Sequence, residues 1–464
     1  MVLKVVLYRG ELEGLDHEFK EFLTRRLDIA SYVSTLRILD YLQYTNPPYV
    51  QRKMAVDLSE PQSRISQLVD SLEERGVRVR LDFSHVPLGL KLLIVIVEGA
   101  RALTNRLPLV DWVSVAYRIS RGVLAVYRAP ADKASEIIDI LRTRTTLIAM
   151  SKSSVKAEFF EVEDGLLARP SLEYWLYRVF DEYPGLEKVN PINAFDLLER
   201  HPRRIDTSNS LDLEEDIAFY PGEPYIGFRD IYDLVLLSHM ERSIFHIKSH
   251  NIDEMLLRTF GKPKLQTLAH EKHVASLSRG SRVVTHGTDP QRGVMNLVCI
   301  AEGSERAVRE LARDLKKHPY AYSLAKLKNV GLFFTMSMPV AYVNRLALEV
   351  EDRYGVDVTH IYQVSIEDVL LRQTIPFRNY DQANRRWSFD NTVGTVLLNY
   401  LRGFVSTKEK IERDVREYIE MAKSSYGEDR VLDAVRELGF DSINDLIDEV
   451  ERAKRKRREM KTQR

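Results

Sequence analysis

The chain has 464 residues, of which 44% are hydrophobic and 29% charged, with 68 basic and 68 acidic side chains. This length allows about two to four domains with cores of their own, and the composition is that of a folded rather than a disordered chain. Because the net charge is zero, any surface that binds nucleic acid must be local rather than a property of the whole molecule.

Residues 27–90 predict a winged helix-turn-helix that follows an N-terminal strand–helix extension in residues 1–26. Apolar side chains at helical spacing indicate three helices, at residues 27–42, 50–56 and 60–74. Gly76 ends the third helix, and residues 77–83 alternate between apolar and polar side chains, as expected for a basic β-hairpin. A helix-turn-helix followed by such a hairpin is the arrangement of a winged helix.

Residues 91–160 predict the order β-α-β-β-α-β of a ferredoxin-like domain. Strands are expected at residues 92–97, 112–119, 123–128 and 146–151, and helices at residues 100–107 and 131–142. Residues 293–370 predict the same order. Strands are expected there at residues 295–301, 321–326, 331–337 and 358–364, and helices at residues 304–317 and 340–354.

Matching residues recur along the chain and indicate an internal duplication. Matches at a constant offset of 204 residues comprise Gly76 with Gly280, Gly89 with Gly293, Glu98 with Glu302, Gly99 with Gly303, and Glu163-Asp164 with Glu367-Asp368. Gly122 and Pro130 keep their mutual spacing in Gly331 and Pro339, shifted by five more residues. The second copy is therefore expected to comprise a winged helix in residues 228–292 and the ferredoxin-like domain in residues 293–370.

Two regions lie outside this duplication. The interrepeat segment, residues 161–227, is rich in aromatic side chains and prolines. Residues 371–464 predict a helical C-terminal extension that ends in a basic tail, with helices at residues 392–404, 407–423, 428–438 and 442–456. The predicted fold class is α+β, with tandem winged helix-turn-helix and ferredoxin-like domains and this helical extension.

The first copy resembles the Lrp/AsnC (feast/famine) regulators over roughly residues 28–155, and the second copy resembles them more loosely over residues 230–365. The matching residues are Leu58-Ser59, Arg64-Ile65, Leu68, Leu72 to Val77, Pro87 to Gly89 and Leu93 to Val97. This resemblance implies a DNA-binding transcriptional regulator. Since members of that family dimerise, the fused repeats are expected to supply both DNA-reading heads within one chain.

The second helix of a helix-turn-helix motif enters the major groove. The polar face of residues 60–74 carries the candidate base-contacting residues Gln62, Ser63, Arg64 and Gln67. Alternatively, these residues form a solvated face of a helix that contacts only proteins.

Basic residues around these helices are candidates for contacts with phosphates. In the first copy they are Arg75, Arg78 and Arg80, in the second Lys262, Lys264, Lys272, Arg279 and Arg282, and in the tail Lys454, Arg455, Lys456 and Arg457; the neutral Gln266 of the second copy is a further candidate contact. Alternatively, they balance acidic surface elsewhere or complement the dipole of a helix C-terminus.

No sequence motif indicates an enzyme, a metal site or a cofactor, and we expect none of the three. Five histidines between positions 239 and 273 lack further ligands at a recognisable spacing. One cysteine, Cys299, excludes an intramolecular disulfide, and no apolar run is long enough for a membrane span, so we expect a cytoplasmic protein without membrane partners. The expected partners are promoter-like DNA with an optional small-molecule effector, or alternatively a ribosome or RNA, bound by a pseudo-twofold monomer or a homodimer.

Overall fold

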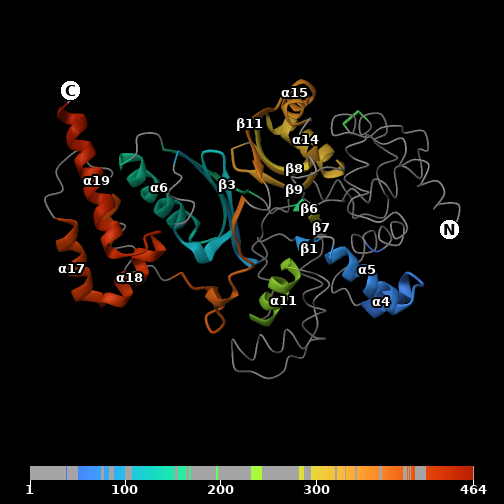
Figure 1. Cartoon of the computed structure of the whole chain (residues 1–464), viewed down its shortest axis with the longest axis horizontal. Coiled ribbons are helices and arrows are strands. Elements are labelled where there is room, and N and C mark those ends of the chain that lie inside the picture. Colours follow the sequence, from blue (N-terminus) through green and yellow to red (C-terminus); the bar gives the residue numbers. More distant parts are fainter. Residues whose placement is uncertain are drawn as a thin grey trace. The chain divides into compact units, whose positions relative to one another are not determined.

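The computed structural model places the chain in two compact units, each made of two separate stretches of sequence (Figure 1). Unit 1 comprises Met1–Gly89 and Val162–Ile366, and unit 2 comprises Leu90–Glu161 and Glu367–Arg464. The residues that the structure describes are 38, 51–74, 78–82, 88–99, 107–151, 155–163, 167–168, 195–196, 231–242, 282–286, 294–318, 321–329, 331–339, 342–364, 368–389, 394, 397, 399–402 and 414–462.

Unit 2 contains a five-stranded antiparallel sheet with the order β12-β3-β4-β2-β5. Its strands are β2 (Leu90–Glu98), β3 (Val113–Ile119), β4 (Gly122–Pro130), β5 (Lys156–Glu161) and β12 (Val369–Arg372). The short 3-10 helix η3 (Val110–Trp112) leads into β3. The order of β2 to β5 in this sheet is that of a ferredoxin-like domain, as predicted.

Helix α6 (Ala134–Ser151) packs on the sheet of unit 2, and it corrects one predicted boundary. The strand predicted at residues 146–151 is wrong because the apolar spacing of the helix continues through Leu147 and Ile148, both of which are buried. The last strand of this ferredoxin-like order is β5, which starts five residues after α6 ends. The helix predicted at residues 100–107 lies almost wholly outside the described residues.

Unit 1 contains a second five-stranded antiparallel sheet, with the order β11-β8-β10-β9-β6. Its strands are β6 (Leu167–Ala168), β8 (Val294–Glu302), β9 (Ala321–Leu327), β10 (Gly331–Pro339) and β11 (Asp357–Val364). Helices α14 (Glu305–Lys317) and α15 (Val343–Tyr354) pack against each other on one face of this sheet (Figure 1). All six elements predicted at residues 293–370 are present within a few residues of their predicted bounds.

The two sheets share their register as well as their strand order. Glu98 pairs with Gly122 at the end of the β2–β4 ladder, and Glu302 pairs with Gly331 at the end of the β8–β10 ladder. At Gly122 a side chain cannot fit, since a Cβ atom would lie 1.8 Å from the carbonyl oxygen of Val97. The residues matched in the sequence therefore occupy equivalent places in two ferredoxin-like domains, and the α+β fold class is confirmed.

The outermost strand of each sheet comes from the segment that follows the other repeat. Strand β6 follows the first repeat and pairs with β9, where Leu167 lies opposite Leu324. Strand β12 follows the second repeat and pairs with β3, where Arg372 lies opposite Val115. The matched acidic pairs found in the sequence precede these two strands.

The described part of the first winged helix comprises α4 (Gln51–Asp57), α5 (Gln62–Glu74) and β1 (Arg78–Asp82). Helix α5 buries Ile65, Leu68 and Val69, which is the apolar face that the sequence predicted. In the second copy the structure describes α11 (Ile231–Arg242) and β7 (Arg282–His286), and the other predicted elements of residues 228–292 lie outside the described residues.

The strand found in the predicted first wing pairs with a strand from the predicted second winged helix. Strands β1 and β7 form a two-stranded antiparallel ribbon in which Arg78 lies opposite His286 and Asp82 opposite Arg282. Arg80 and Val284 occupy its centre, so the ribbon is symmetric with respect to the 204-residue offset. The prediction that residues 77–83 form a hairpin within one wing is wrong in this respect, because the partner strand comes from the other copy.

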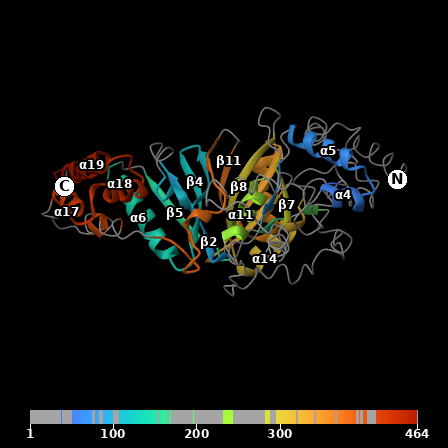
Figure 2. The same cartoon turned by 90° about the horizontal axis from the view of Figure 1, so that it is seen from below.

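The C-terminal extension forms α17 (Val415–Tyr426), α18 (Glu428–Glu437) and α19 (Ile443–Thr462). The predicted start of α17 at residue 407 is wrong, because Asp414 caps the helix by accepting a hydrogen bond from the backbone N–H of Arg416 at 3.3 Å. Figures 1 and 2 show α6 between the sheet of unit 2 and α19, and α6 and α19 are in contact.

The turn between α18 and α19 is fixed on α6 by Arg144. Its guanidinium is buried, donates to the carbonyl oxygen of Gly439 at 3.4 Å and lies 3.8 Å above the centre of the Phe440 ring. The backbone N–H of Leu109 also donates to the carbonyl oxygen of Glu437 at 2.7 Å. The extension is thereby part of the core of unit 2 rather than a separate tail.

Between β12 and the extension lies a small hairpin of β13 (Tyr380–Asp381) and β14 (Arg386–Trp387), preceded by the 3-10 helix η8 (Phe377–Asn379). Trp112 packs edge-on against Trp387, with 6.2 Å between their ring centres. None of the described helices is long and apolar enough to cross a membrane.

Candidate functional site

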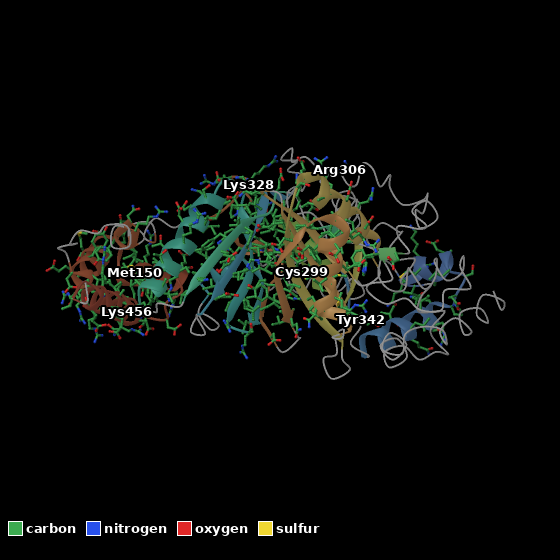
Figure 3. All side chains as sticks on the ribbon, turned by 90° about the horizontal axis from the view of Figure 1, so that it is seen from above. Met150, Cys299, Arg306, Lys328, Tyr342 and Lys456 are labelled. Carbon is green, nitrogen blue, oxygen red and sulfur yellow. The ribbon has the colours of Figure 1, made fainter. Side chains whose placement is uncertain are left out.

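The two faces of each sheet can be assigned from unit 2. A cavity beneath α6 is lined by Val95, Val97 and Ala125 of the sheet together with Leu141 and Arg144 of α6. These strand residues therefore point toward the helix, and their neighbours along the strands point to the opposite face. Because unit 1 has the same register, Cys299 on β8 corresponds to Val95 and lies on its helix-covered face (Figure 3).

The helix-covered face is apolar in both units. In unit 1 it contributes Leu297, Cys299, Ala301, Leu332 and Phe334, all completely buried. Burial raises the pKa of the Cys299 thiol above its usual range, so the residue acts as a small apolar group of the core. This face supports the fold and offers no reactive group.

The opposite face differs between the two units, row by row across the strands. In unit 2 one row comprises Leu124, Ile96 and Glu158, and the next comprises Val126, Ile94 and Phe160. In unit 1 the corresponding rows comprise Phe333, Ile300 and His360, and then Thr335, Val298 and Tyr362. In these two rows β8 keeps the aliphatic character of β2, whereas its neighbours β11 and β10 bring an imidazole, a phenol and a hydroxyl.

A further polar difference follows at the next position of β8 on the same face. Asn296 of β8 stands where β2 has Leu92. We call the four residues Asn296, Thr335, His360 and Tyr362 the polar face of unit 1. Thr335 and Tyr362 are buried, with 5% and 8% of their surfaces exposed, and His360 is half-buried.

The local sequence explains how β11 presents His360 and Tyr362. Gly355 ends α15 in the left-handed conformation with φ of 64°, and the chain then alternates side chains along β11. His360 and Tyr362 are two residues apart and share a face, and their ring centres lie 5.8 Å apart.

The hydroxyl of Thr359 lies beside the His360 ring. It is 3.3 Å from the carbonyl oxygen of Ile300, to which it donates, and 3.0 Å from Nδ1 of His360. When its one proton goes to the carbonyl, the hydroxyl oxygen can accept a hydrogen bond from Nδ1–H, which helps to orient the ring.

The residues predicted to contact bases lie on α5. Gln62, Ser63 and Gln67 are exposed and Arg64 is half-buried, so the polar face of this helix is where the sequence placed it. Their role in binding nucleic acid stays a prediction.

The other predicted contacts are scattered over several elements. Arg78 and Arg80 lie on β1 and Arg282 on β7, while Lys454, Arg455, Lys456 and Arg457 lie on α19. Of the tail residues, Lys454 forms an ion pair with Glu451 at 2.9 Å. Arg75, Lys262, Lys264, Gln266, Lys272 and Arg279 lie outside the described residues.

Sequence reasoning did not single out the polar face. A lone histidine on a strand has no motif spacing, and the five histidines that the sequence did single out lie elsewhere. The signal was available in the duplication, because aligning the two copies strand by strand puts His360 against Glu158 and Thr335 against Val126. Within the described part of the chain, no cluster of three metal-binding side chains is present.

No family profile and no curated protein sequence matches the chain. Among solved structures, the chain is similar to the siroheme decarboxylase NirDL at 13% sequence identity and a TM-score of 0.40, over 74% of this chain and 93% of the other. The complex of NirDL with an iron-uroporphyrin III analogue gives 13% identity and a TM-score of 0.41, over 74% and 94%. The similarity is distant.

This comparison corrects the functional expectation. The sequence predicted a DNA-binding regulator, or alternatively a ribosome- or RNA-associated factor, and in either case no enzyme. That inference is wrong, because the solved structures that match the chain are those of an enzyme. A winged helix joined to a ferredoxin-like domain describes a fold and does not by itself identify a regulator.

Proposed function

We propose that the polar face of unit 1 binds a small organic molecule that carries carboxylate groups. The observation that supports this is the restricted difference between the two repeats. Their helix-covered faces are mainly apolar. On the opposite face, Asn296, Thr335 and Tyr362 stand where unit 2 has Leu92, Val126 and Phe160, while in the Leu92 row unit 2 carries Arg128 where unit 1 has Ser337.

The replacement gives unit 1 side chains that can form hydrogen bonds where Leu92 and Val126 of unit 2 offer only apolar surface. Polar side chains held at such positions are typical of a face that recognises a polar ligand.

The chemistry of the polar face favours an acceptor-rich ligand. Asn296, Thr335, His360 and Tyr362 can each donate a hydrogen bond. The corresponding row of unit 2 instead carries the acid Glu158. Several donors on one face can bind and orient the oxygens of a carboxylate, which only accept hydrogen bonds when ionised.

The experiment is a binding titration of the full-length protein by calorimetry and thermal shift. The ligand panel contains amino acids, dicarboxylates, iron-uroporphyrin III and siroheme, and mass spectrometry records whether any ligand loses CO₂. We expect at least one carboxylate ligand to bind, with a stabilisation of about 2.7 kcal/mol at 100 times its Kd.

The variants His360→Ala and Tyr362→Phe should weaken this binding at least tenfold, which corresponds to about 1.4 kcal/mol. Glu158→Ala, at the corresponding place in unit 2, is the matched control and should bind like the wild type. If no carboxylate ligand binds, or if the control loses affinity as much as His360→Ala does, the proposal is wrong.

A further inference from the structure

We propose that the outer edges of β3 and β9 are strand-addition sites, and that each accepts a donor strand only from the opposite repeat of the same chain. The first donor comprises Val162, Glu163 and β6 (Leu167–Ala168), and the second comprises Asp368, β12 (Val369–Arg372) and Gln373. This is the mode in which an extended segment adds to a sheet edge through backbone hydrogen bonds.

The first donor segment cannot reach the edge of its own sheet. Glu161 ends β5, and its second neighbour Glu163 already donates its backbone N–H to the carbonyl oxygen of Lys326 on β9 at 2.8 Å. In its own sheet the same segment would have to lie beyond β3, four strands away from β5. Four strand spacings are about 19 Å, whereas two residues of chain span at most about 7 Å.

The second donor segment is equally restricted. Val369 lies opposite Tyr117, which precedes the hairpin glycine Gly122 by five residues. Lys326 precedes the corresponding glycine of the other sheet, Gly331, by the same number. In the sheet of its own repeat, Val369 would therefore lie beside Lys326. From Val364, the end of β11, that place is four strands across and five residues along β8, a diagonal of about 25 Å. The five residues from Val364 to Val369 span at most about 18 Å.

At each site, residues next to the donor strand add contacts with the edge strand. Glu163 forms an ion pair with Lys326, with 2.8 Å between carboxylate oxygen and Nζ, and Val162 forms a single bridge with Leu327. At the other site the backbone N–H of Gln373 donates to the carbonyl oxygen of Ser114 at 2.9 Å, just beyond the ladder of β12. Each donor is thus held by its ladder with the edge strand and by contacts that the residues next to the donor strand form with that edge.

The tethered donor also outcompetes a strand from a second copy of the protein, because it is present at a higher local concentration. A segment joined to the chain by a few residues has an effective concentration of about millimolar, which a second copy of the protein would not reach at ordinary concentrations. Filling both edges in this way removes two unpaired strand edges that would otherwise invite aggregation.

Disulfide trapping in the full-length protein tests the proposal. In a Cys299→Ala background, the pairs Arg372→Cys with Val115→Cys and Ala168→Cys with Ser323→Cys join donors to opposite-repeat edges, because these residues face each other in the ladders. The recombined pairs, Ala168→Cys with Val115→Cys and Arg372→Cys with Ser323→Cys, are matched controls that use the same four positions.

We expect the first two pairs to form disulfides, or to be bridged by a short bis-thiol reagent, within a single chain. The recombined pairs should remain unlinked. Crosslinks in the recombined pairs, covalent dimers as the main product, or no linkage in either of the first two pairs would each overturn the proposal.

A peptide experiment tests the edge itself as a binding site. The double variant Val369→Pro with Leu371→Pro removes β12, since proline cannot donate to a ladder. A fluorescent peptide with the sequence of residues 366–374 should bind this variant at least tenfold more tightly than the wild type, whose edge is occupied. Equal binding to both proteins would contradict the selectivity for the tethered donor, and if the variant does not fold, the crosslinks decide.

Discussion

Phe440 provides a direct test of whether the C-terminal extension is part of the core of unit 2. Its side chain is 2% exposed, and the guanidinium of Arg144 lies 3.8 Å from its ring centre. Truncation of a buried phenylalanine to alanine costs about 3–5 kcal/mol, and a desolvated cation–π contact accounts for up to about 2 kcal/mol of that. Phe440→Ala should therefore lower the free energy of unfolding of unit 2 by about 3–5 kcal/mol.

Two further variants separate the contributions. Phe440→Leu keeps most of the apolar volume and loses the ring, so it should cost only about 1–2 kcal/mol. Tyr426→Ala removes an aromatic ring of the same extension that is 37% exposed, and should change stability by no more than about 0.5 kcal/mol.

Hydrogen exchange followed by mass spectrometry is the appropriate assay, because unfolding of a two-unit chain does not yield a single free energy. Phe440→Ala should accelerate exchange in α6 and β4 as well as in α18 and α19. If only the extension exchanges faster and α6 is unaffected, the extension is an appendage and the argument from Arg144 fails.

Three more predictions use contrasts within the chain. Gly122→Ala should destabilise the sheet of unit 2 by about 1–3 kcal/mol or more in denaturant melts, because its Cβ would meet the Val97 carbonyl at 1.8 Å. Gly331→Ala, whose nearest neighbour would lie 3.3 Å from the added Cβ, should be nearly neutral. Equal effects of the two variants would disprove the close approach at Gly122. Burial, with Asp414 and Glu451 nearby, raises the pKa of Tyr400 to about 12 from its usual 10. The stability that this shift contributes is complete below pH 10 and is lost as the pH rises toward 12. Tyr400→Phe should therefore lose less stability than the wild type between pH 10 and 12 in alkaline melts, and an unchanged pH profile would contradict this. Cys299, the only cysteine and fully buried with a raised pKa, should react with a thiol reagent at pH 8 only after unfolding, and fast labelling of the native protein would place it elsewhere.

The sequence predicted the ferredoxin-like order in both copies because strand alternation and helical spacing are local signals. Helices α14 and α15 followed from apolar spacing. The structure adds that Ser304 caps α14, since its hydroxyl accepts from the backbone N–H of Ala307 at 3.3 Å. The strand predicted at residues 146–151 failed because Thr145 and Thr146 favour strands, whereas each hydroxyl donates back to a carbonyl one helical turn earlier.

Pairing between distant segments was beyond sequence reasoning. Nothing in residues 78–82 indicates that their partner strand lies at 282–286, because a strand can pair with any compatible edge. The polar face was missed for a related reason, since Asn296, Thr335 and His360 come from three strands and meet only once their register is known. The functional expectation rested on the helix-turn-helix pattern, which many proteins share.

Because unit 2 is made of two distant stretches of sequence, it cannot complete its fold until late in the synthesis of the chain. Its first stretch ends at Glu161, yet β12 and the C-terminal helices that complete it come from Glu367–Arg464. After Glu161, about 210 residues must be synthesised before β12 is complete and about 300 before the C-terminal helices are. This takes about 10–40 s and 15–60 s, respectively, at a ribosomal rate of roughly 5–20 residues per second. During the first interval the edge of β3 stays uncovered and during the second the surface of α6 does, and the nascent protein depends on chaperones or on the speed of translation to keep them from aggregating.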